Sequence, residues 1–451
     1  MRDVANRPLL LSPRIAVGLT YAELCRELGE PQVRLRPWCR PKSLDDAWRE
    51  ITRALVFGAE VTLFDADWTE SEIHAVGFAE EQLGTARTVA GLPGLTPERL
   101  AAAVSASSAA RINLFTSGST GRPRLVRHSL ASLVRGVRTT AAHHGDIWAF
   151  AYNPTHIAGV QVFLQALANL NTLVDVTGLD RLTIYDVVRR HRVSHVSATP
   201  TFYRLLLPCL EPLPGVCRVV LGGEASAADL RAELGRIFPA ASLRNIYAST
   251  EAGSLLACDG EVFSVPPHLA DAIVVREGRL LLHRRLMAEF DGPWIDGEWY
   301  DTGDRVEIVE RDPVRFRFAG RERDSVNVGG DKVNPQEVEA VLGEHPGVGH
   351  VRVFGRKNSV MGQILCAEVV QAKTDSQVPT AAGKSALPQT GARNAKASGE
   401  QTNDGGQLTE AALRAFAAER LPPCKIPRLI RFVHHLASTR TKKLSRTEDD
   451  R

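Results

Sequence analysis

The chain has 451 residues, of which 44% are hydrophobic and 24% charged, and its formal net charge is +3 at pH 7. This length predicts at least two domains, and so small a charge argues against a nucleic-acid-binding protein. No run of eighteen apolar residues predicts a spanning helix, and the N-terminal segment lacks the apolar core of a secretion signal. The seven cysteines form no CxxC pair, which argues against a disulfide framework or a zinc site and favours a reducing cytoplasm.

Residues 111–253 alternate between segments typical of buried strands and segments typical of helices. Strands are predicted at RINLFTS, DIWAFAY, TLVDV, VSHVSAT, CRVVLGG and LRNIYAS, and helices at VQVFLQALANL, IYDVVRRH, PTFYRLLL and SAADLRAELGRIF. Strands that alternate with helices are joined by crossover connections, so we expect a largely parallel sheet. The pattern predicts an α/β fold class for a large N-terminal domain of residues 1–320.

A different pattern follows residue 253. From about 270 to 320, the segments AIVVREGRLLLHRR, DRVEIVE and VRFRFAG predict a small β-rich subdomain of short antiparallel strands. Residues 324–451 predict a small α+β C-terminal domain with strands at HVRVFGR and ILCAEVVQ and a helix at TEAALRAFAAERL. Its first helix, NPQEVEAVLGEH, has Asn334 as a plausible N-cap and Pro335 at its first position.

Residues 372–407 interrupt the small domain. They are rich in Ala, Gly, Ser, Thr, Gln and Lys and poor in large apolar residues. Such a segment cannot bury enough surface to offset the entropy lost on ordering, so we predict a disordered insertion.

A loop rich in glycine and hydroxyl groups follows the first predicted strand, in NLFTSGSTGRPRLVRHS. Its residues are Thr116, Ser117, Gly118, Ser119, Thr120 and Gly121. Glycines let backbone N–H groups converge on an anion, and hydroxyls add donors, so the loop predicts a triphosphate cradle. It is not a Walker loop, because Arg122 and Pro123 follow the last glycine, and no GxGxxG is present. Alone, such a run is also typical of an ordinary surface turn.

Further segments follow the loop in a fixed order: GGEAS, NIYASTEAG, GEWYDTGD, GRERDSVNVGGDKVNPQEVE and LASTRTKKLSR. In this order the segments resemble the motifs of the adenylate-forming superfamily, which includes acyl- and aryl-CoA synthetases, peptide-synthetase adenylation domains and luciferases. The resemblance covers roughly residues 111–446 and implies a large N-terminal domain with a small, mobile C-terminal domain. It also implies a reaction: a carboxylate attacks the α-phosphorus of ATP, pyrophosphate leaves, and the acyl group passes to a thiol.

The resemblance implies roles for residues around the nucleotide. The loop from Thr116 to Gly121 would hold the β- and γ-phosphates with Arg124, where the family usually has Lys. Tyr247 would stack on adenine, and the backbone of the GGEAS segment would approach the other side of the base. The further nucleotide-contacting residues are Gly222, Gly223, Glu224, Ala248 and Ser249.

The resemblance also implies the groups that meet the α-phosphate, the ribose and the metal. Thr250 would contact the α-phosphate, and Glu251 would bind Mg²⁺, which takes one or two carboxylates plus phosphate oxygens. Asp304, fixed by a tight turn at residues 302–303, would accept hydrogen bonds from the ribose hydroxyls. Arg321 would touch the ribose or the α-phosphate.

The last motif implies the adenylation lysine. Lys443 would bridge the substrate carboxylate and the α-phosphate and stabilise charge that develops in the transition state. The family pattern is Pro-x-Thr-x-x-Gly-Lys-x-x-Arg, and Lys442 stands here in place of its glycine. The spacing to Arg446 favours Lys443 over Lys442. Arg323 falls at the position of the family's inter-domain hinge residue.

The segment AYNPTHIAGVQVF resembles the acyl-pocket segment of the family. His156 would lie beside the acyl carboxylate and guard the thiol channel. Relatives that activate amino acids carry an Asp here that pairs with the α-ammonium group, and none occurs between Tyr152 and Leu170. We therefore expect a fatty or aromatic acid without an α-amine.

The thiol acceptor is expected to be coenzyme A or the phosphopantetheine of a separate acyl carrier protein. Gly329 and Gly330 could line a narrow pantetheine passage for either acceptor, and coenzyme A is favoured by its frequency in the family. Three hypotheses stay open: an acid–CoA ligase, an enzyme that loads a carrier protein, and a nucleotide-binding scaffold that has lost catalysis.

Overall fold

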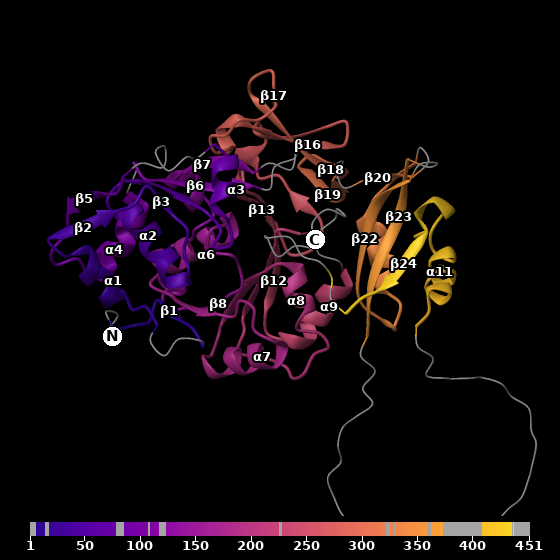
Figure 1. Cartoon of the computed structure of the whole chain (residues 1–451), viewed down its shortest axis with the longest axis horizontal. Coiled ribbons are helices and arrows are strands. Elements are labelled where there is room, and N and C mark those ends of the chain that lie inside the picture. The colour runs from indigo at the N-terminus through magenta and orange to yellow at the C-terminus, as the bar shows by residue number, and fades with distance from the viewer. Residues whose placement is uncertain are drawn as a thin grey trace, which may run out of the picture. The chain divides into compact units, whose positions relative to one another are not determined.

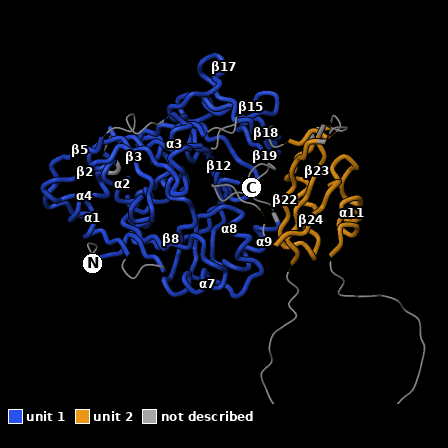
Figure 2. The backbone as a smooth tube through the Cα atoms, in the orientation of Figure 1, with its two compact units in different colours: residues 1–322, 440–443 blue, residues 323–439, 444–451 orange. Residues whose placement is uncertain are grey.

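The computed structural model describes residues 6–13, 18–77, 85–106, 109–116, 123–224, 228–321, 325–328, 331–358, 362–372, 408–434 and 436. The described residues up to 321 form one compact unit, and those from 325 onward form a second (Figure 2). None of the helices in these ranges has the length and the apolar character needed to cross a membrane.

A seven-stranded sheet is the largest sheet of the first unit (Figure 1). In spatial order its strands are β1 (Leu10–Leu11), β9 (Thr172–Asp175), β8 (Ile147–Phe150), β10 (His195–Ala198), β11 (Arg218–Gly222), β12 (Ser242–Ser249) and β13 (Gly253–Cys258). All neighbours pair in parallel except β13, which runs antiparallel to β12. This sheet confirms the predicted α/β fold class.

A second, four-stranded sheet takes up the strand that precedes the predicted phosphate loop. Its order is β3 (Trp38–Cys39), β4 (Glu60–Leu63), β6 (Arg111–Thr116) and β7 (Arg124–Ser129). Strand β6 is parallel to β4 and antiparallel to β7. The sequence pattern suggested one sheet over residues 111–253, and this was wrong for β6, because its parallel partner comes from the N-terminal hundred residues.

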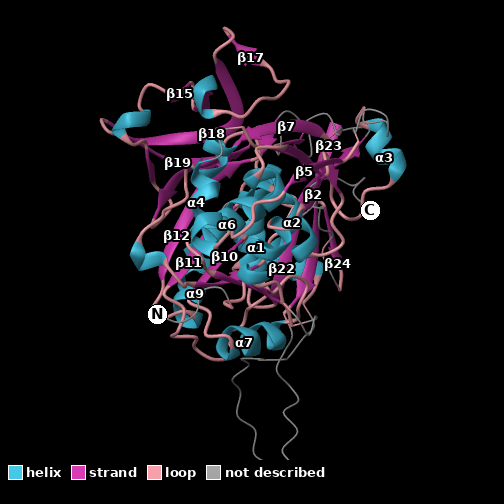
Figure 3. Cartoon of the chain, turned by 90° about the vertical axis from the view of Figure 1, so that its left-hand side faces the viewer, coloured by secondary structure: helices cyan, strands magenta, loops and turns pink. Residues whose placement is uncertain are grey.

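Helices fill the space between these two sheets. They are α1 (Tyr21–Leu28), α2 (Leu44–Val56), α4 (Pro97–Ala106), α5 (Leu130–Val134) and α6 (Ile157–Ala168), four of which are labelled together in Figure 3. Helix α2 shows why they form: Ser43 caps its first turn, two aspartates favour its N-terminal end, and its apolar residues recur at helical spacing.

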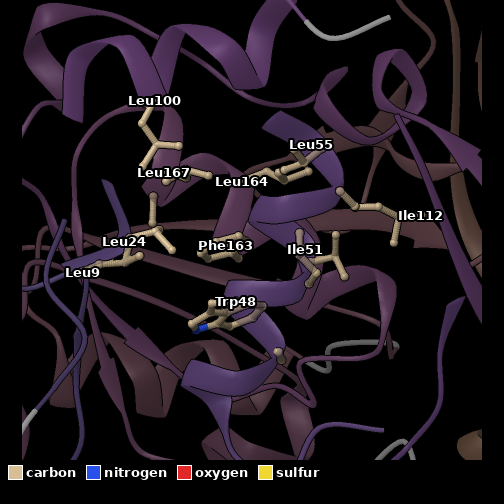
Figure 4. Close-up of a cluster of buried hydrophobic side chains, with 14 of the residues drawn as sticks. Leu9, Leu24, Trp48, Ile51, Leu55, Leu100, Ile112, Phe163, Leu164 and Leu167 are labelled. Atoms are coloured by element: carbon tan, nitrogen blue, oxygen red, sulfur yellow. The ribbon is translucent and has the colours of Figure 1, made fainter. Parts of the chain in front are cut away.

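The apolar side chains of this layer make one core with the strands on both sides (Figure 4). Trp48 of α2 stacks on Phe163 of α6, with ring centroids 4.2 Å apart and planes 2° from parallel. Ile112 of β6 joins the same cluster. The two sheets are therefore held by one continuous packed layer, which fixes the ends of β6 relative to those of β8 and β12.

The other face of the seven-stranded sheet packs against α7 (Arg181–Arg190), α8 (Pro200–Arg204) and α9 (Ala228–Ile237). The antiparallel sheet predicted near residues 270–320 has six strands. They are β14 (Phe263–Ser264), β19 (Val314–Arg321), β18 (Trp299–Arg311), β16 (Arg279–His283) and β15 (Ile273–Arg276), with β17 (Trp294–Ile295) beside β18. A short pair, β2 (Gln32–Leu35) with β5 (Arg87–Ala90), and helix α3 (Glu70–Ala75) complete the first unit.

The second unit is a five-stranded sheet with two helices on one apolar face. Its strands are β21 (Asp331–Val333), β20 (Val326–Val328), β23 (Gly362–Gln371), β22 (Val348–Asn358) and β24 (Leu429–Phe432), and its helices α10 (Pro335–Gly343) and α11 (Glu410–Ala418). The predicted start of α10 is confirmed: Asn334 is its N-cap, with the side chain accepting from the Gln336 N–H at 3.0 Å, and Pro335 is its first residue. Residues 373–407, which include nearly all of the predicted insertion, lie outside the described residues.

Candidate active site

The predicted phosphate loop joins two strands of a hairpin. Thr116 is the last residue of β6 and Arg124 the first of β7, and the two are register partners. Ser117 to Gly121 lie outside the described residues, so the hairpin gives only the two ends of the loop. The return strand β7 was not predicted, because its sequence RLVRHS is largely polar and basic.

Arg124 is held from one side by an aromatic ring. Its guanidinium carbon lies 5.8 Å from the ring centroid of Phe290, within the range of a cation–π contact. A planar guanidinium stacks on aromatic faces better than a lysine ammonium does. The aromatic neighbour therefore gives a physical reason for Arg at a position where relatives usually have Lys.

The turn after β12 carries the residues predicted to meet the α-phosphate and the metal. Its three consecutive carbonyls, of Thr250, Glu251 and Ala252, each have a hydrogen-bond donor outside the turn. These donors are the His128 imidazole, the Ala288 N–H and the Arg135 guanidinium. The hydroxyl of Ser249 closes the turn by accepting from the Ala252 N–H at 3.2 Å. Hydrogen bonds to all three carbonyl oxygens therefore fix the backbone of this turn.

The Glu251 carboxylate could serve a magnesium ion. The side chain is half-buried, and no residue in the described ranges bonds to its carboxylate oxygens. No cluster of three or more His, Cys, Asp or Glu that could hold a metal occurs in those ranges. A single available carboxylate fits Mg²⁺ that takes most of its ligands from phosphate oxygens and water.

Tyr247, Asp304 and Arg321 form one hydrogen-bonded unit. The Tyr247 hydroxyl donates to Asp304 Oδ2 at 2.7 Å, and Arg321 Nε donates to Asp304 Oδ1 at 2.6 Å. Asp304 is only 4% exposed, whereas the Arg321 side chain is 50% exposed. Burial and the neighbouring carboxylate raise the pKa of Tyr247 well above its usual value, so the phenol keeps its proton. The unit therefore holds a carboxylate oriented by two donors, with a cation at its open side.

Phe318 of β19 stacks on the Tyr247 ring, with centroids 4.7 Å apart and planes at 27°. One face of Tyr247 is thus covered by Phe318, and the residue as a whole is buried, with 8% of its surface exposed. The sequence predicted a tight turn at residues 302–303, and this was wrong: the segment is an irregular stretch of β18. Gly303 takes φ +73° there, and the Thr302 hydroxyl accepts from the Asp304 N–H at 3.1 Å. A bulged strand, not a turn, fixes the carboxylate.

The GGEAS segment begins at the carboxyl end of β11. Gly222 pairs with Ile246 of β12, and Gly223 has φ +83°, a backbone conformation that favours glycine. Glu224 is engaged locally: one carboxylate oxygen accepts from the backbone N–H and the hydroxyl of Thr201, at 3.0 and 2.7 Å. This carboxylate anchors the start of α8, and Gly223 is exposed.

His156 is the N-cap residue of α6, and its side chain pairs with an acid far away in the sequence. Its Nε2 lies 3.1 Å from Asp65, which follows β4, and Asp65 also accepts from Asn153 Nδ2 at 3.1 Å and from the Thr155 hydroxyl. The acyl-pocket segment does therefore contact a carboxylate, although none lies within residues 152–170. Because its oxygens already accept from these three side chains, Asp65 is a poor partner for a substrate ammonium group.

The remaining predicted residues, Arg323, Gly329, Gly330 and Lys443, lie outside the described residues. Ala248 lies on β12 at an irregularity in its pairing with β13, between Tyr247 and the turn. The structure thus forms two groups of predicted residues. Tyr247, Asp304 and Arg321 make one hydrogen-bonded unit. Thr250 and Glu251 lie in the turn that follows β12, the strand that carries Tyr247.

Three contacts in this site were missed from the sequence: those of His128, Asp65 and Phe318. Their partners lie 122, 91 and 71 positions away in the sequence. The spacing of residues within one segment cannot predict contacts between segments so far apart. The one available hint is compositional, since a histidine inside a strand is uncommon at a fully buried position.

A profile of the AMP-binding enzyme family matches residues 49–281, and a profile of the AMP-binding enzyme C-terminal domain matches residues 337–443. The chain is 25% identical over 367 residues to the 2-succinylbenzoate–CoA ligase of Geobacillus kaustophilus (strain HTA426), which covers 74% of this chain and 68% of that protein. It is 27% identical over 386 residues to human mitochondrial acyl-coenzyme A synthetase ACSM4, covering 74% of this chain and 59% of that protein.

The fold is similar to that of the o-succinylbenzoate CoA synthetase of Bacillus subtilis, solved with its acyl-adenylate intermediate, with a TM-score of 0.66 at 17% identity. That match covers 98% of this chain and 95% of the other. The chain spans about half to two thirds of the length of the curated relatives it matches. The two profiles together confirm the assignment made from the order of the motifs: the chain belongs to the AMP-binding enzyme family.

Proposed function

We propose that the chain is an AMP-forming acid–thiol ligase that uses ATP to activate a carboxylic acid. The observation that carries this proposal is the unit of Tyr247, Asp304 and Arg321. A buried carboxylate oriented by two donors suits the two hydroxyls of a ribose, and the half-exposed guanidinium beside it suits a phosphate. We assign adenine stacking to the Tyr247 ring, on the face that Phe318 does not cover.

In the first half-reaction, a carboxylate oxygen of the acid attacks the α-phosphorus, and the bond from that phosphorus to the bridging oxygen breaks to release pyrophosphate. Arg124 and the loop from Thr116 to Gly121 hold the leaving phosphates, and Thr250 orients the α-phosphate. Glu251 would hold Mg²⁺, which when bound neutralises phosphate charge that would repel the incoming carboxylate. Lys443 bridges the two reacting anions, so positioning and charge neutralisation supply most of the rate.

In the second half-reaction, a thiol sulfur attacks the acyl carbonyl and AMP leaves. We assign coenzyme A as the acceptor, a choice supported by the CoA ligases and CoA synthetases among the chain's relatives. The small domain, residues 324–451, pivots at Arg323 between the half-reactions, and Gly329 and Gly330 line the passage of the pantetheine arm. A reducing cytoplasm is the compartment that suits a chain whose seven cysteines show no disulfide pattern.

The acid is a fatty or aromatic acid without an α-amine. Support comes from Asp65, because this carboxylate, which contacts the acyl-pocket segment, is already shared among Asn153, Thr155 and His156. An α-ammonium group would have to displace one of these donors. The 2-succinylbenzoate ligases among the relatives make an aryl dicarboxylic acid a sensible member of any substrate panel.

The test is acid-dependent exchange of labelled pyrophosphate into ATP, with fatty acids, aryl acids, 2-succinylbenzoate and an α-amino acid as substrates. We expect exchange with at least one acid that has no α-amine, and release of AMP and formation of a thioester when coenzyme A is added. Exchange without thioester formation on coenzyme A, but with loading of a carrier protein, would replace the acceptor. Binding of ATP with no exchange for any acid would identify a scaffold and contradict the proposal.

A further inference from the structure

The carbonyl of Thr250 is tied to strand β7 by a histidine from the strand's buried face. His128 Nε2 lies 2.7 Å from the Thr250 carbonyl oxygen, and the His128 side chain is fully buried. A carbonyl oxygen only accepts, so Nε2 must carry a hydrogen and donate. This bond joins residues 122 positions apart and crosses from the four-stranded sheet to the end of β12.

The Thr250 carbonyl fixes the tautomer, because a neutral ring that donates through Nε2 has no hydrogen on Nδ1. His128 Nδ1 lies 3.0 Å from the Ser132 hydroxyl, which also lies 2.8 Å from the Ser129 carbonyl. Burial lowers the pKa of His128 to about 4, so the ring is neutral near pH 7, and Nδ1 and the Ser129 carbonyl share the single hydrogen of the Ser132 hydroxyl. The donor on Nε2 is therefore permanently aimed at the turn.

The same strand also begins at the phosphate loop. Arg124 opens β7, and His128 lies four residues further along, on the same strand. Between them, the Arg127 N–H and carbonyl pair with Glu289 at 2.8 and 3.0 Å, and Ala288, the residue before Glu289, donates its N–H to the Glu251 carbonyl at 2.7 Å. One short strand thus carries the end of the loop and, through His128, one anchor of the turn.

We propose that His128 is a positioning residue that sets the place of Glu251, and of the cation it holds, relative to the phosphate loop. The proposal rests on the function proposed above. The histidine touches no ligand itself. It acts through the Thr250 carbonyl, the peptide group that lies directly before Glu251. Loss of the bond frees that peptide to rotate, so the carboxylate should lose its alignment while the nucleoside unit stays intact.

Two near-isosteric substitutions separate the donor from the ring. In His128→Gln the amide nitrogen occupies the place of Nε2 and can still donate to the Thr250 carbonyl. In His128→Asn the amide nitrogen occupies the place of Nδ1, and the bond to the turn is lost. A merely structural role would leave both variants similar, because each replaces a buried ring with a smaller amide.

The measurement is calorimetric binding of ATP with and without Mg²⁺, and of AMP, which reports on the nucleoside unit. We expect H128N to lose about tenfold of the magnesium-dependent gain in ATP affinity, the scale seen when groups that orient a metal ligand are removed. H128Q should keep the gain within about threefold, and AMP affinity should be unchanged in both. Leu133→Ala, a buried change on the neighbouring helix α5, is the control for lost stability.

Each outcome decides the proposal. An equal magnesium-dependent gain in H128N and the wild-type chain would overturn it, as would equal losses in H128N, H128Q and L133A. If H128N does not fold, His128→Ser takes its place with the same expectation, because it also lacks a donor that reaches the carbonyl. A wild-type chain that does not bind ATP would instead contradict the proposed function itself.

Discussion

The proposed nucleoside end and the proposed triphosphate end of the candidate site are held in different ways. At the nucleoside end, side chains hold one another: Asp304 accepts hydrogen bonds from Tyr247 and from Arg321. Asp304 and Tyr247 are buried. At the triphosphate end, the described contacts hold the backbone of the turn and leave the carboxylate of Glu251 without a hydrogen-bond partner in the described ranges.

This difference suits the two parts of the ligand. The nucleoside is the same in ATP, in an acyl-adenylate and in AMP, so rigid side chains can match it throughout. The phosphates and their cation change during the reaction, so the groups that meet them must be free to exchange ligands on a fixed backbone. The predictions below test whether the two ends can be disabled separately, from the largest expected effect to the smallest.

Lys443→Ala should lower acid-dependent pyrophosphate exchange by about 100- to 1000-fold, the scale of a lost group that stabilises transition-state charge. Nucleotide binding should change little, and thioester formation from a supplied acyl-adenylate should survive. The matched variant is Lys442→Ala. If Lys442→Ala loses pyrophosphate exchange and Lys443→Ala keeps it, the assignment of the lysine is wrong.

The free energy of unfolding should depend on pH through His128. Its pKa is about 4 in the folded chain against about 6.5 when unfolded, so the unfolded chain takes up the proton first as the pH falls. The stabilisation of the folded chain that comes from the lowered pKa of His128 is fully present above pH 6.5. It is lost as the pH falls towards 4, by up to about 3 kcal/mol. Denaturant unfolding at several pH values in this range gives the free energy of unfolding at each pH. This free energy should change less steeply with pH in His128→Gln than in the wild-type chain. Equal slopes would contradict the neutral, buried state of His128.

Asp304→Asn should weaken AMP and ATP alike by about 10- to 100-fold, because an amide group would face two donors and leave one of them unpaired. The magnesium dependence of ATP binding should stay as in the wild-type chain. Glu307→Gln, an exposed acid on the same strand, is the control. A loss confined to ATP would show that the two ends are not separable.

Glu251→Gln should raise the magnesium concentration needed for half-maximal exchange by about tenfold and leave AMP affinity unchanged. Gln keeps the size of the side chain, so the fixed turn should persist. The exposed neighbour Glu289→Gln is the control for a change of charge. Superimposable magnesium titrations of E251Q and the wild-type chain would remove Glu251 from the metal site.

Phe290→Leu should have the smallest effect, a rise of about two- to fivefold in the KM for ATP, as expected for one partly exposed cation–π contact. The loss should vanish in an Arg124→Ala background, because the ring acts only through that guanidinium. An undiminished loss in the double variant would show that Phe290 acts through packing instead.

The sequence predicts the elements of this molecule better than the contacts between them. The strand and helix segments over residues 111–371 follow local apolar spacing. Among the described motif residues, Thr116, Arg124 and Gly222 lie at strand ends, whereas Asp304 lies inside β18. Strand β7 was missed because a polar strand has no apolar alternation, and the second sheet was missed because β4, the parallel partner of β6, comes from the N-terminal hundred residues.

The missed contacts have the same physical origin. His128 reaches Thr250 through one ring nitrogen, and the Asp65 carboxylate accepts from Asn153, Thr155 and His156, at sequence separations of 122 and of 88 to 91. A contact between two distant segments depends on how the two sheets pack. The spacing of residues within either segment therefore does not predict it. The order of motifs can therefore name the groups that face a ligand but not the groups that hold them in place.

The most direct test of the central claim follows an oxygen atom. An acid that supports pyrophosphate exchange is labelled with ¹⁸O in its carboxylate and turned over with ATP and the thiol acceptor, and the released nucleotide is weighed by mass spectrometry. Attack of the carboxylate on the α-phosphorus, followed by attack of the thiol on the acyl carbon, must leave one carboxylate oxygen on AMP. We predict AMP with a single ¹⁸O. Release of ADP, or AMP without label, would contradict the account.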